Sequence, residues 1–215
     1  MVEPPVLVGS DELDALAEAV FGSEEGRGRV APLLRRWDAE VGAIHESDPD
    51  HELWHALRVD WALCDAELER RGDTWAARAA AGLVEGIAPD PRWSAVASTH
   101  VGLFEVWASE PAFLRDRLRG VSVPLRDPVR LVPPDDGPAA LWEVRVCITE
   151  GHAHLCRAPL PYPLELLPLL EEAYAARFLP DGAPLRWSKL RRAWLAVSRA
   201  TRADPIALFE RILAG

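Results

Sequence analysis

The chain has 215 residues, of which 49% are hydrophobic and 27% charged, a balance that predicts a folded globular protein and excludes a disordered one. Its formal net charge of −10 disfavours nucleic acid and anionic membranes as partners, because both are repelled unless a local basic patch binds them. No apolar run reaches the ~18 residues that cross a bilayer, and the first residues lack the pattern of a secretory signal, so we expect a cytoplasmic protein without a membrane partner.

The first 88 residues are predicted to form helices. Apolar side chains recur at helical spacing over residues 10–20 and again over 30–41, and the glycines at 22, 26 and 28 are expected to separate these two helices. A third helix is predicted to begin near Pro49 and to end at Arg71, and a fourth follows it and ends near Gly86. Together they form a helical bundle.

Residues 95–160 change to the two-residue period of strands. One strand is predicted over 101–107. Over 142–148 apolar and polar residues alternate, and a turn at 150–151 leads into a partner strand over 152–157. This part of the chain is therefore expected to form antiparallel hairpins.

The segment 112–126 fits either a short helix or a hairpin. The alternation of Val121 and Val123, with Gly120 where a turn is needed, favours the hairpin. The result is an antiparallel meander of four or five strands. Helical spacing returns over 161–215. The sequence thus predicts one compact α+β unit with an N-terminal helical region (1–88), an antiparallel β region (95–160) and C-terminal helices (161–215).

The sharpest motif, His51-Glu52-Leu53-Trp54-His55, lies at the start of the third predicted helix. It matches the H-E-x-x-H pattern of zinc peptidases, in which two histidines four residues apart bind the metal and the glutamate acts as general base. One function that the sequence permits is therefore a zinc-dependent hydrolase with His51 and His55 as ligands and Glu52 as base.

The context of this motif favours a solvated first helical turn with two ordinary histidines. On a helical wheel, Trp54 and Leu57 belong to an apolar stripe, whereas His51 and His55 lie on the far flank. Pro49 places His51 in the first turn, where the positive end of the helix dipole disfavours a dication. No histidine or glutamate further along the chain has the spacing of a third ligand.

The predicted hairpin around residues 150–151 forms a second constellation. One face of it carries four possible zinc ligands: Cys147, His152, His154 and Cys156. Ligands on one flat strand pair close a tetrahedron poorly, so we favour the alternative that this face packs under a helix, with the cysteines as small buried hydrophobes. With Cys64 the chain has three cysteines, an odd number that predicts reduced thiols.

The segment 186–202 is basic and aromatic. It holds six basic residues and no acidic one: Arg186, Lys189, Arg191, Arg192, Arg199 and Arg202. Trp187 and Trp194 are interleaved with them, a pattern typical of nucleic-acid-binding surfaces. The tryptophans share the apolar side of a helical wheel, so the interpretation we favour is an amphipathic helix with a solvated basic face. Lys189 is the only lysine of the chain.

Short motifs between residues 50 and 130 carry a resemblance to a known group of proteins. Residues 60–65 have the form D-W-x-x-x-D, 102–106 a glycine-hydrophobic-Glu-Val form, and 114–120 the form L-R-D-x-x-x-G. This pattern resembles uncharacterised bacterial proteins that sometimes carry a SEC-C zinc motif. The resemblance implies a helical region followed by strands, with Asp116 and Gly120 in a hairpin, and no assigned activity. The cysteine-rich SEC-C motif is missing here, so its zinc does not carry over.

No motif for a nucleotide-binding loop, a nucleophile elbow or a C-x-x-C redox pair is present, so no cofactor is expected. We therefore interpret the chain as a non-enzymatic protein that acts through a protein partner, in an interaction or regulatory role. The alternatives are the zinc-dependent hydrolase of the 51–55 motif, with zinc as its metal, and nucleic-acid binding through the basic 186–202 helix.

Overall fold

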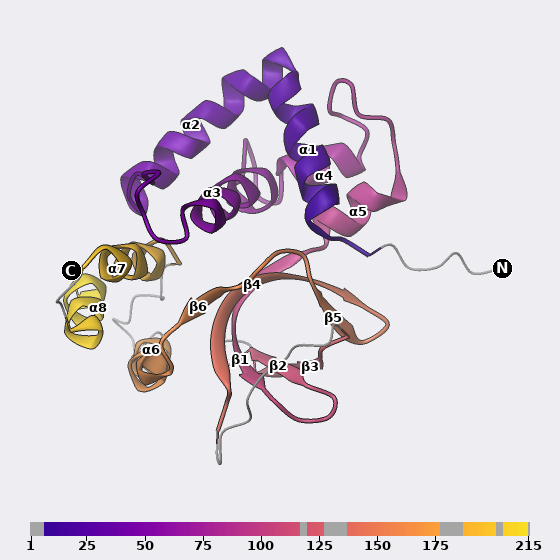
Figure 1. The fold of residues 1–215 in the computed structure, drawn as a ribbon. Helices are drawn as coiled ribbons and strands as arrows, with labels where there is room; N and C mark the ends of the chain where they lie inside the picture. Colours follow the sequence, from indigo (N-terminus) through magenta and orange to yellow (C-terminus); the bar gives the residue numbers. More distant parts are fainter. Residues whose placement is uncertain (1–6, 117–119, 127–136, 177–186, 201–203, 215) are drawn as a thin grey trace.

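The structure is a computed structural model that describes residues 7–116, 120–126, 137–176, 187–200 and 204–214 (Figure 1). The N-terminal helices form a layer on one side of a curled antiparallel sheet, and the C-terminal helices lie along the flank of that sheet. The predicted α+β class, with a helical N-terminal part, a central antiparallel sheet and C-terminal helices, is confirmed.

The N-terminal layer is built from short helices with a common apolar core. In the described residues these elements are α1 (Ser10–Gly22), α2 (Glu24–Glu40), α3 (His51–Asp60), the π-helical turn η1 (Trp61–Asp65), α4 (Trp75–Ala80) and α5 (Pro91–Ala97). The apolar stripe predicted for α1 is buried, and Leu16 and Val20 pack with Val30, Leu63 and Trp75 from the neighbouring elements.

Only Ser23 separates α1 from α2, so the expected break is wrong for Gly26 and Gly28, which lie inside α2. The Ser23 hydroxyl oxygen accepts a hydrogen bond from the Gly26 backbone N–H (2.9 Å) and so caps the start of α2. A Cβ atom at Gly26 would lie 1.8 Å from the carbonyl oxygen of Val20. Glycine is therefore what allows the two helices to turn this tightly.

Helix α3 is regular only from His51 to Asp60, so its predicted continuation to Arg71 is wrong. It passes into η1, where the Ala66 N–H donates to the carbonyl oxygen of Trp61 (2.8 Å), five residues back. At the end of this wider turn, Asp65 forms an ion pair with Arg145 of the sheet. The regular helix therefore ends where the chain contacts a residue far along the sequence. Helical periodicity alone could not predict such a contact.

The two remaining helices of this layer are capped by side chains. Thr74 Oγ1 accepts a hydrogen bond from the Ala77 N–H (3.1 Å) at the start of α4, which ends at Ala80 and not near Gly86. The Asp90 carboxylate accepts from the Arg92 N–H (2.8 Å) at the start of α5. Helix α5 is not among the predicted helices, because a helix this short shows no clear period.

Within the described residues, the sheet has six strands, one more than the upper end of the expected four or five. Its described strands are β1 (His100–Trp107), β2 (Phe113–Asp116), β3 (Val121–Pro124), β4 (Ala140–Thr149), β5 (His152–Leu155) and β6 (Leu160–Tyr162). They pair antiparallel in the order β3-β2-β1-β4-β5, with β6 also beside β4. The hairpin over 112–126 is confirmed, and so is the turn at 150–151, because Thr149 pairs with His152. Strand β6 was not predicted, since three residues around a proline show no alternation.

The sheet curls until its edges meet, at a bridge between Leu125 and Ala153. Its inner face is filled by a core that includes Phe104, Val106 and Val144. Successive residues of β4 point to opposite faces, so the outer face carries a different set: Glu143, Arg145 and Cys147, all buried. These polar and thiol groups therefore face the helices.

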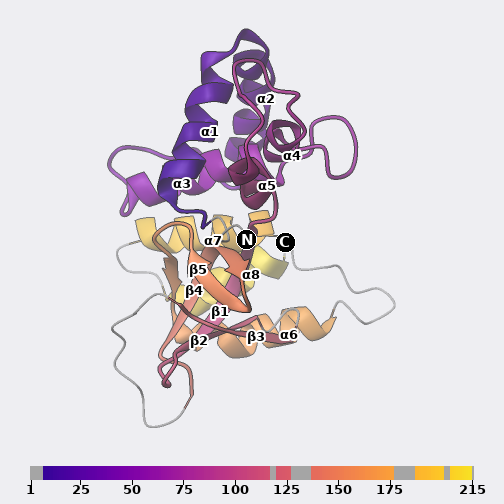
Figure 2. The same cartoon turned by 90° about the vertical axis from the view of Figure 1, so that its right-hand side faces the viewer.

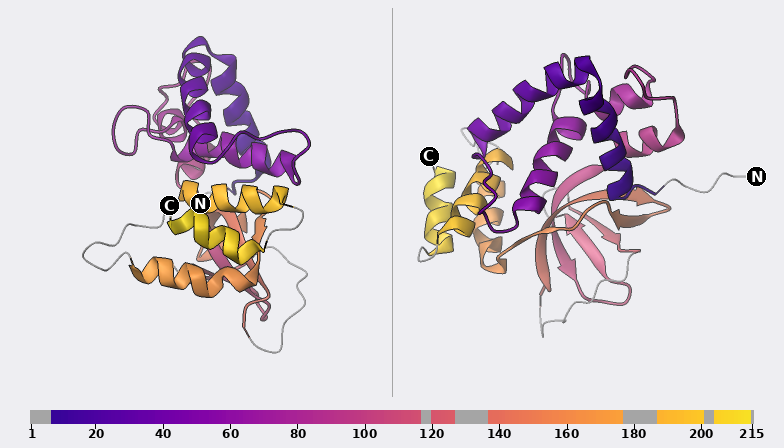
Figure 3. Two further views of the ribbon diagram at one scale, coloured as in Figure 1. Left: turned by 90° about the vertical axis from the view of Figure 1, so that its left-hand side faces the viewer. Right: turned by 45° about the horizontal axis from the view of Figure 1, so that its top comes forward.

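The described C-terminal elements are the 3₁₀ turn η2 (Leu164–Leu166), α6 (Leu167–Ala176), α7 (Trp187–Arg199) and α8 (Pro205–Ala214). Figures 2 and 3 show α7 between the N-terminal layer and α8. Buried Glu143 on the outer face of the sheet accepts hydrogen bonds from Arg191 Nε (2.7 Å) and from the Tyr162 hydroxyl (2.9 Å). Burial raises the pKa of Tyr162 well above its usual value. Within the described ranges, no helix has the length and apolar character needed to cross a membrane.

Candidate functional site

Two adjoining hollows lie along α3, with volumes of about 710 and 370 Å³. Both include His51, Glu52, Ala56 and Arg157. The larger one opens over the first turn of α3, and the smaller one lies between α3 and α1. We call the two together the α1–α3 groove, because these helices supply most of its walls.

The floor of the α1–α3 groove is apolar and follows helical spacing. It is formed by half-buried side chains of α1 and α3: Ala17, Phe21, Leu53, Ala56 and Val59. The opposite faces of the same helices are filled by the core, since Leu16, Trp54 and Leu57 are buried. The groove is therefore a second apolar stripe that this chain leaves partly uncovered.

Arg157, on the connection from β5 to β6, fixes one wall of the groove. Its guanidinium donates from Nε (2.7 Å) and Nη2 (3.1 Å) to the Asp60 carboxylate, and from Nη2 (2.6 Å) to Asp14 Oδ1. Asp60 is buried, and burial raises its pKa even though Arg157 bonds to it. A single side chain thus joins the sheet to both helices of the groove.

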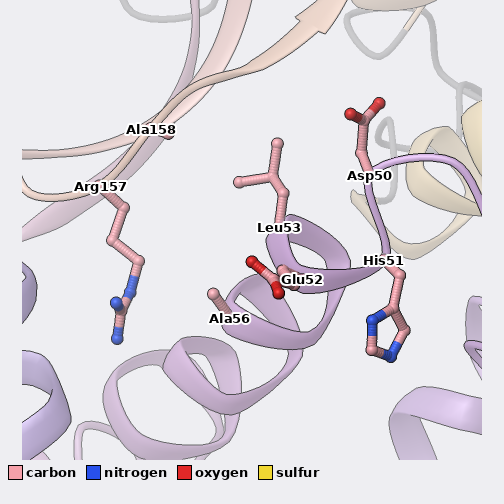
Figure 4. Close-up of a pocket in the computed structure, with 7 residues that line it drawn as sticks. All are labelled: Asp50, His51, Glu52, Leu53, Ala56, Arg157 and Ala158. Carbon is pink, nitrogen blue, oxygen red and sulfur yellow. The ribbon is translucent and has the colours of Figure 1, made fainter. Parts of the chain in front are cut away.

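The rim of the groove is acidic. Asp14, Asp50 and Glu52 are exposed, and the side chain of Asp14 is 65% exposed. The side chain of Arg157 is only 13% exposed, and the buried Asp60 carboxylate balances its charge. Figure 4 shows Arg157 at one end of the larger hollow, with Glu52, Leu53 and Ala56 in the middle and His51 at the opposite end.

The predicted zinc ligands lie on this groove but do not form a completed site. His51 and His55 have ring centroids 6.3 Å apart, with the rings edge to face. In the part of the chain that the structure describes, no three His, Cys, Asp or Glu side chains come together as a metal would need. The cation that shares the hollow is the guanidinium of Arg157. Zinc binding by His51 and His55, with Glu52 as base, stays a prediction.

The second predicted constellation lies mainly in the core. Cys147 pairs with His154 as expected, and Cys147 and Cys156 pack with the N-terminal helices. His152 remains at the turn, where Nδ1 lies 3.1 Å from the Glu150 carbonyl oxygen. Burial raises the pKa of Cys156 to about 12, and also that of Cys64 to about 12, so both thiols stay protonated and unreactive at neutral pH.

The basic helix is α7, and three of its arginines bond to other parts of the chain. Arg191 is buried against Glu143, Arg192 donates to the carbonyl oxygen of Ala39 (3.0 Å), and Arg199 bonds to Asp48 (2.7 Å). The expected solvated basic face is therefore wrong for Arg191, whereas Arg192 and Arg199 are exposed as expected, although each also bonds within the chain. Arg186 and Arg202 lie outside the described residues.

Sequence reasoning located one wall of the groove and missed the other. The 51–55 motif marks α3, but no pattern indicates that Arg157 meets Asp60, which is 97 residues away along the chain. The comparisons with known proteins add no guidance, because no family model, curated protein or solved structure matches the chain. The resemblance to proteins with a SEC-C motif stays a prediction.

Proposed function

We propose that this protein acts by binding a protein partner, and that the partner inserts a cationic amphipathic helix into the α1–α3 groove. The observation that carries the proposal is the combination of an apolar floor at helical spacing with an acidic rim. Amphipathic helices bind such grooves through apolar residues spaced three or four apart, which face the floor.

The shape of the groove suits a helix. Leu53, Ala56 and Val59 recur every three residues along α3, and Ala17 and Phe21 lie four apart along α1. Small alanine side chains on both walls leave room for the larger apolar side chains of a partner. Burial of such side chains is worth about 1.5–3 kcal/mol each before the entropy of association is subtracted.

The charge of the groove selects the kind of helix. Carboxylates of Asp14, Asp50 and Glu52 border the floor, and the whole chain carries a net charge of −10. Lysine and arginine side chains flanking the apolar face of a partner would be attracted to this rim and would raise the rate of association. An acidic helix would be repelled.

Arg157 supports the proposal by holding the groove in shape. Its bonds to Asp14 of α1 and Asp60 of α3 set the distance between the two walls in the absence of a partner. A groove that is already formed loses less entropy on binding than one that must be assembled.

A designed peptide tests the proposal. The probe is a fluorescein-labelled helix of about 15 residues, with leucine at helical spacing on one face and lysine elsewhere. We expect saturable binding in fluorescence anisotropy, weaker at high salt, and no binding of the same peptide with glutamate in place of lysine.

Substitutions place the binding on the groove. Ala56→Asp puts a charge on the floor, and we expect it to weaken peptide binding at least about tenfold. Leu83→Asp is the matched control, because Leu83 is 68% exposed and lies outside the groove. Equal binding by both variants, or no binding by the unaltered protein, would overturn the proposal.

A further inference from the structure

A separate hollow of about 350 Å³ lies where α2, η1 and α7 meet. It shares no residue with the α1–α3 groove. Figure 3 shows the C-terminal half of α2 above α7. Its volume falls in the range of small-molecule sites, about 300–1,000 Å³.

Three tryptophans from three different elements line this hollow. Trp37 of α2 is buried, whereas Trp61 of η1 and Trp187 of α7 are half-buried. The rings of Trp37 and Trp61 have centroids 5.4 Å apart. Trp61 continues the helical bonding of α3, because its N–H donates to the carbonyl oxygen of Leu57, so the end of α3 contributes to this surface as well as to the core.

Each of these indoles is already covered on one side by a guanidinium. Arg191 Cζ lies 4.7 Å from the ring centre of Trp37 and 5.8 Å from that of Trp187, and Arg36 Cζ lies 4.7 Å from that of Trp61. A further cation would be repelled by these arginines, so the hollow is not a cage for ammonium ligands. A flat ring, by contrast, stacks on both indole and guanidinium planes.

The polar groups of the hollow form a pair of opposite charges. Arg191 is neutralised by buried Glu143. Arg36 and Glu40 are exposed on α2, one helical turn apart, and in the described residues neither has an ion-pair partner within 4.0 Å. The guanidinium of Arg36 and the carboxylate of Glu40 thus lie beside the tryptophan side chains of the hollow.

We propose that this hollow binds an aromatic α-amino acid. The ring would stack against the half-buried indoles, the α-carboxylate would accept hydrogen bonds from Arg36, and the α-ammonium would donate to Glu40. This ligand class fits because it is planar and zwitterionic, as the wall and the Arg36–Glu40 pair require. This site is separate from the α1–α3 groove, so the protein would bind a small molecule in addition to the proposed peptide partner.

The test uses L-phenylalanine and L-tryptophan as probes, in ligand-observed NMR and titration calorimetry. We expect saturable binding of both with one site per chain. Three analogues separate the contributions: phenethylamine lacks the carboxylate, 3-phenylpropionate lacks the ammonium, and cyclohexylalanine lacks the flat ring. Each should bind at least about tenfold more weakly than phenylalanine.

Matched variants place the probes in the hollow. Arg36→Gln and Glu40→Gln should each weaken binding at least about tenfold, whereas Arg35→Gln, which is exposed on the same helix but outside the hollow, should leave it unchanged. Binding of neither amino acid, or equal affinities for Arg35→Gln and Arg36→Gln, would overturn the proposal. Peptide binding by Arg36→Gln reports separately on the α1–α3 groove.

Discussion

Arg157 is the residue on which the geometry of the candidate site depends. It leaves the β5–β6 connection and contacts Asp14 of α1 and Asp60 of α3. Asp60 is buried, so it has no access to water that could replace the guanidinium. Removal of one partner from such a pair leaves an uncompensated charge, which is more destabilising than the pair itself is stabilising.

We expect Arg157→Ala to lower the free energy of unfolding by about 3 kcal/mol at neutral pH. Urea denaturation measures this, with Arg71→Ala as the control, since Arg71 is exposed. Peptide binding should weaken as well, because α1 and α3 lose their common contact. An Arg157→Ala protein as stable as the control would show that the pair contributes nothing.

The loss of stability caused by Arg157→Ala should depend on pH. Burial raises the pKa of Asp60, so the folded state holds this proton more tightly than the unfolded chain does, and ionisation opposes folding as the pH rises. Without Arg157, which favours the ionised form of Asp60, ionisation opposes folding more strongly. The difference from the unaltered protein should therefore shrink as the pH falls toward ~4, the ordinary pKa of aspartate.

At the scale of elements, the connection between α2 and α3 is tied to α7 by Asp48. Its carboxylate accepts hydrogen bonds from Arg199 Nε (2.7 Å) and Nη2 (2.5 Å), and from the His45 backbone N–H (2.7 Å). The hydrogen bonds from Arg199 are the main cause that lowers the pKa of Asp48 from 3.8 to about 2. A loop of the N-terminal layer is thereby fastened to a C-terminal helix.

Asp48→Asn should lower the free energy of unfolding by about 1–2 kcal/mol at neutral pH, because the charged hydrogen bonds become weaker. The folded pKa lies below the unfolded one, so the carboxylate stabilises the fold above about pH 4, and this contribution is lost as the pH falls toward 2. Acid titrations of the two proteins should converge there. Glu46→Gln, at an exposed site in the same connection, should follow the unaltered protein.

Elements that depend on neighbouring residues could be predicted from the sequence, whereas those that depend on distant contacts could not. The hairpin turn at 150–151 was predicted with its register, because turn type and alternation both act within a few residues. The π-helical end of α3 was not predicted, because it accompanies the contact between Asp65 and Arg145, 80 residues apart. The burial of Arg191 on α7 was missed for the same reason, since its partner Glu143 lies on β4.

At the scale of the whole molecule, buried ion pairs cross between the layers. Arg145 and Arg157 join the sheet region to η1 and α3, and Arg191 joins α7 to the sheet. The fold class followed from the period of the sequence, but the groove did not, because its walls come from α1, α3 and the β5–β6 connection, which are up to 143 residues apart along the chain. The H-E-x-x-H motif marked only one of them.

We expect the helical layer and the sheet to unfold together. Their ion pairs are buried, so separation of the layers would leave charges without partners. Urea transitions followed by far-UV circular dichroism and by tryptophan fluorescence should coincide, since tryptophans occur in both parts. Two separate midpoints would show that the layers are independent units.

The choice of arginine for these internal pairs has a consequence in alkaline solution. Lysine loses its charge near pH ~10.4, whereas guanidinium groups keep theirs beyond pH ~12. The chain has a single lysine, and the cations at its buried contacts, Arg145, Arg157 and Arg191, are guanidinium groups. Tyr162, which could otherwise ionise beside Glu143, is held neutral by burial. The interior is thus built to tolerate base better than acid.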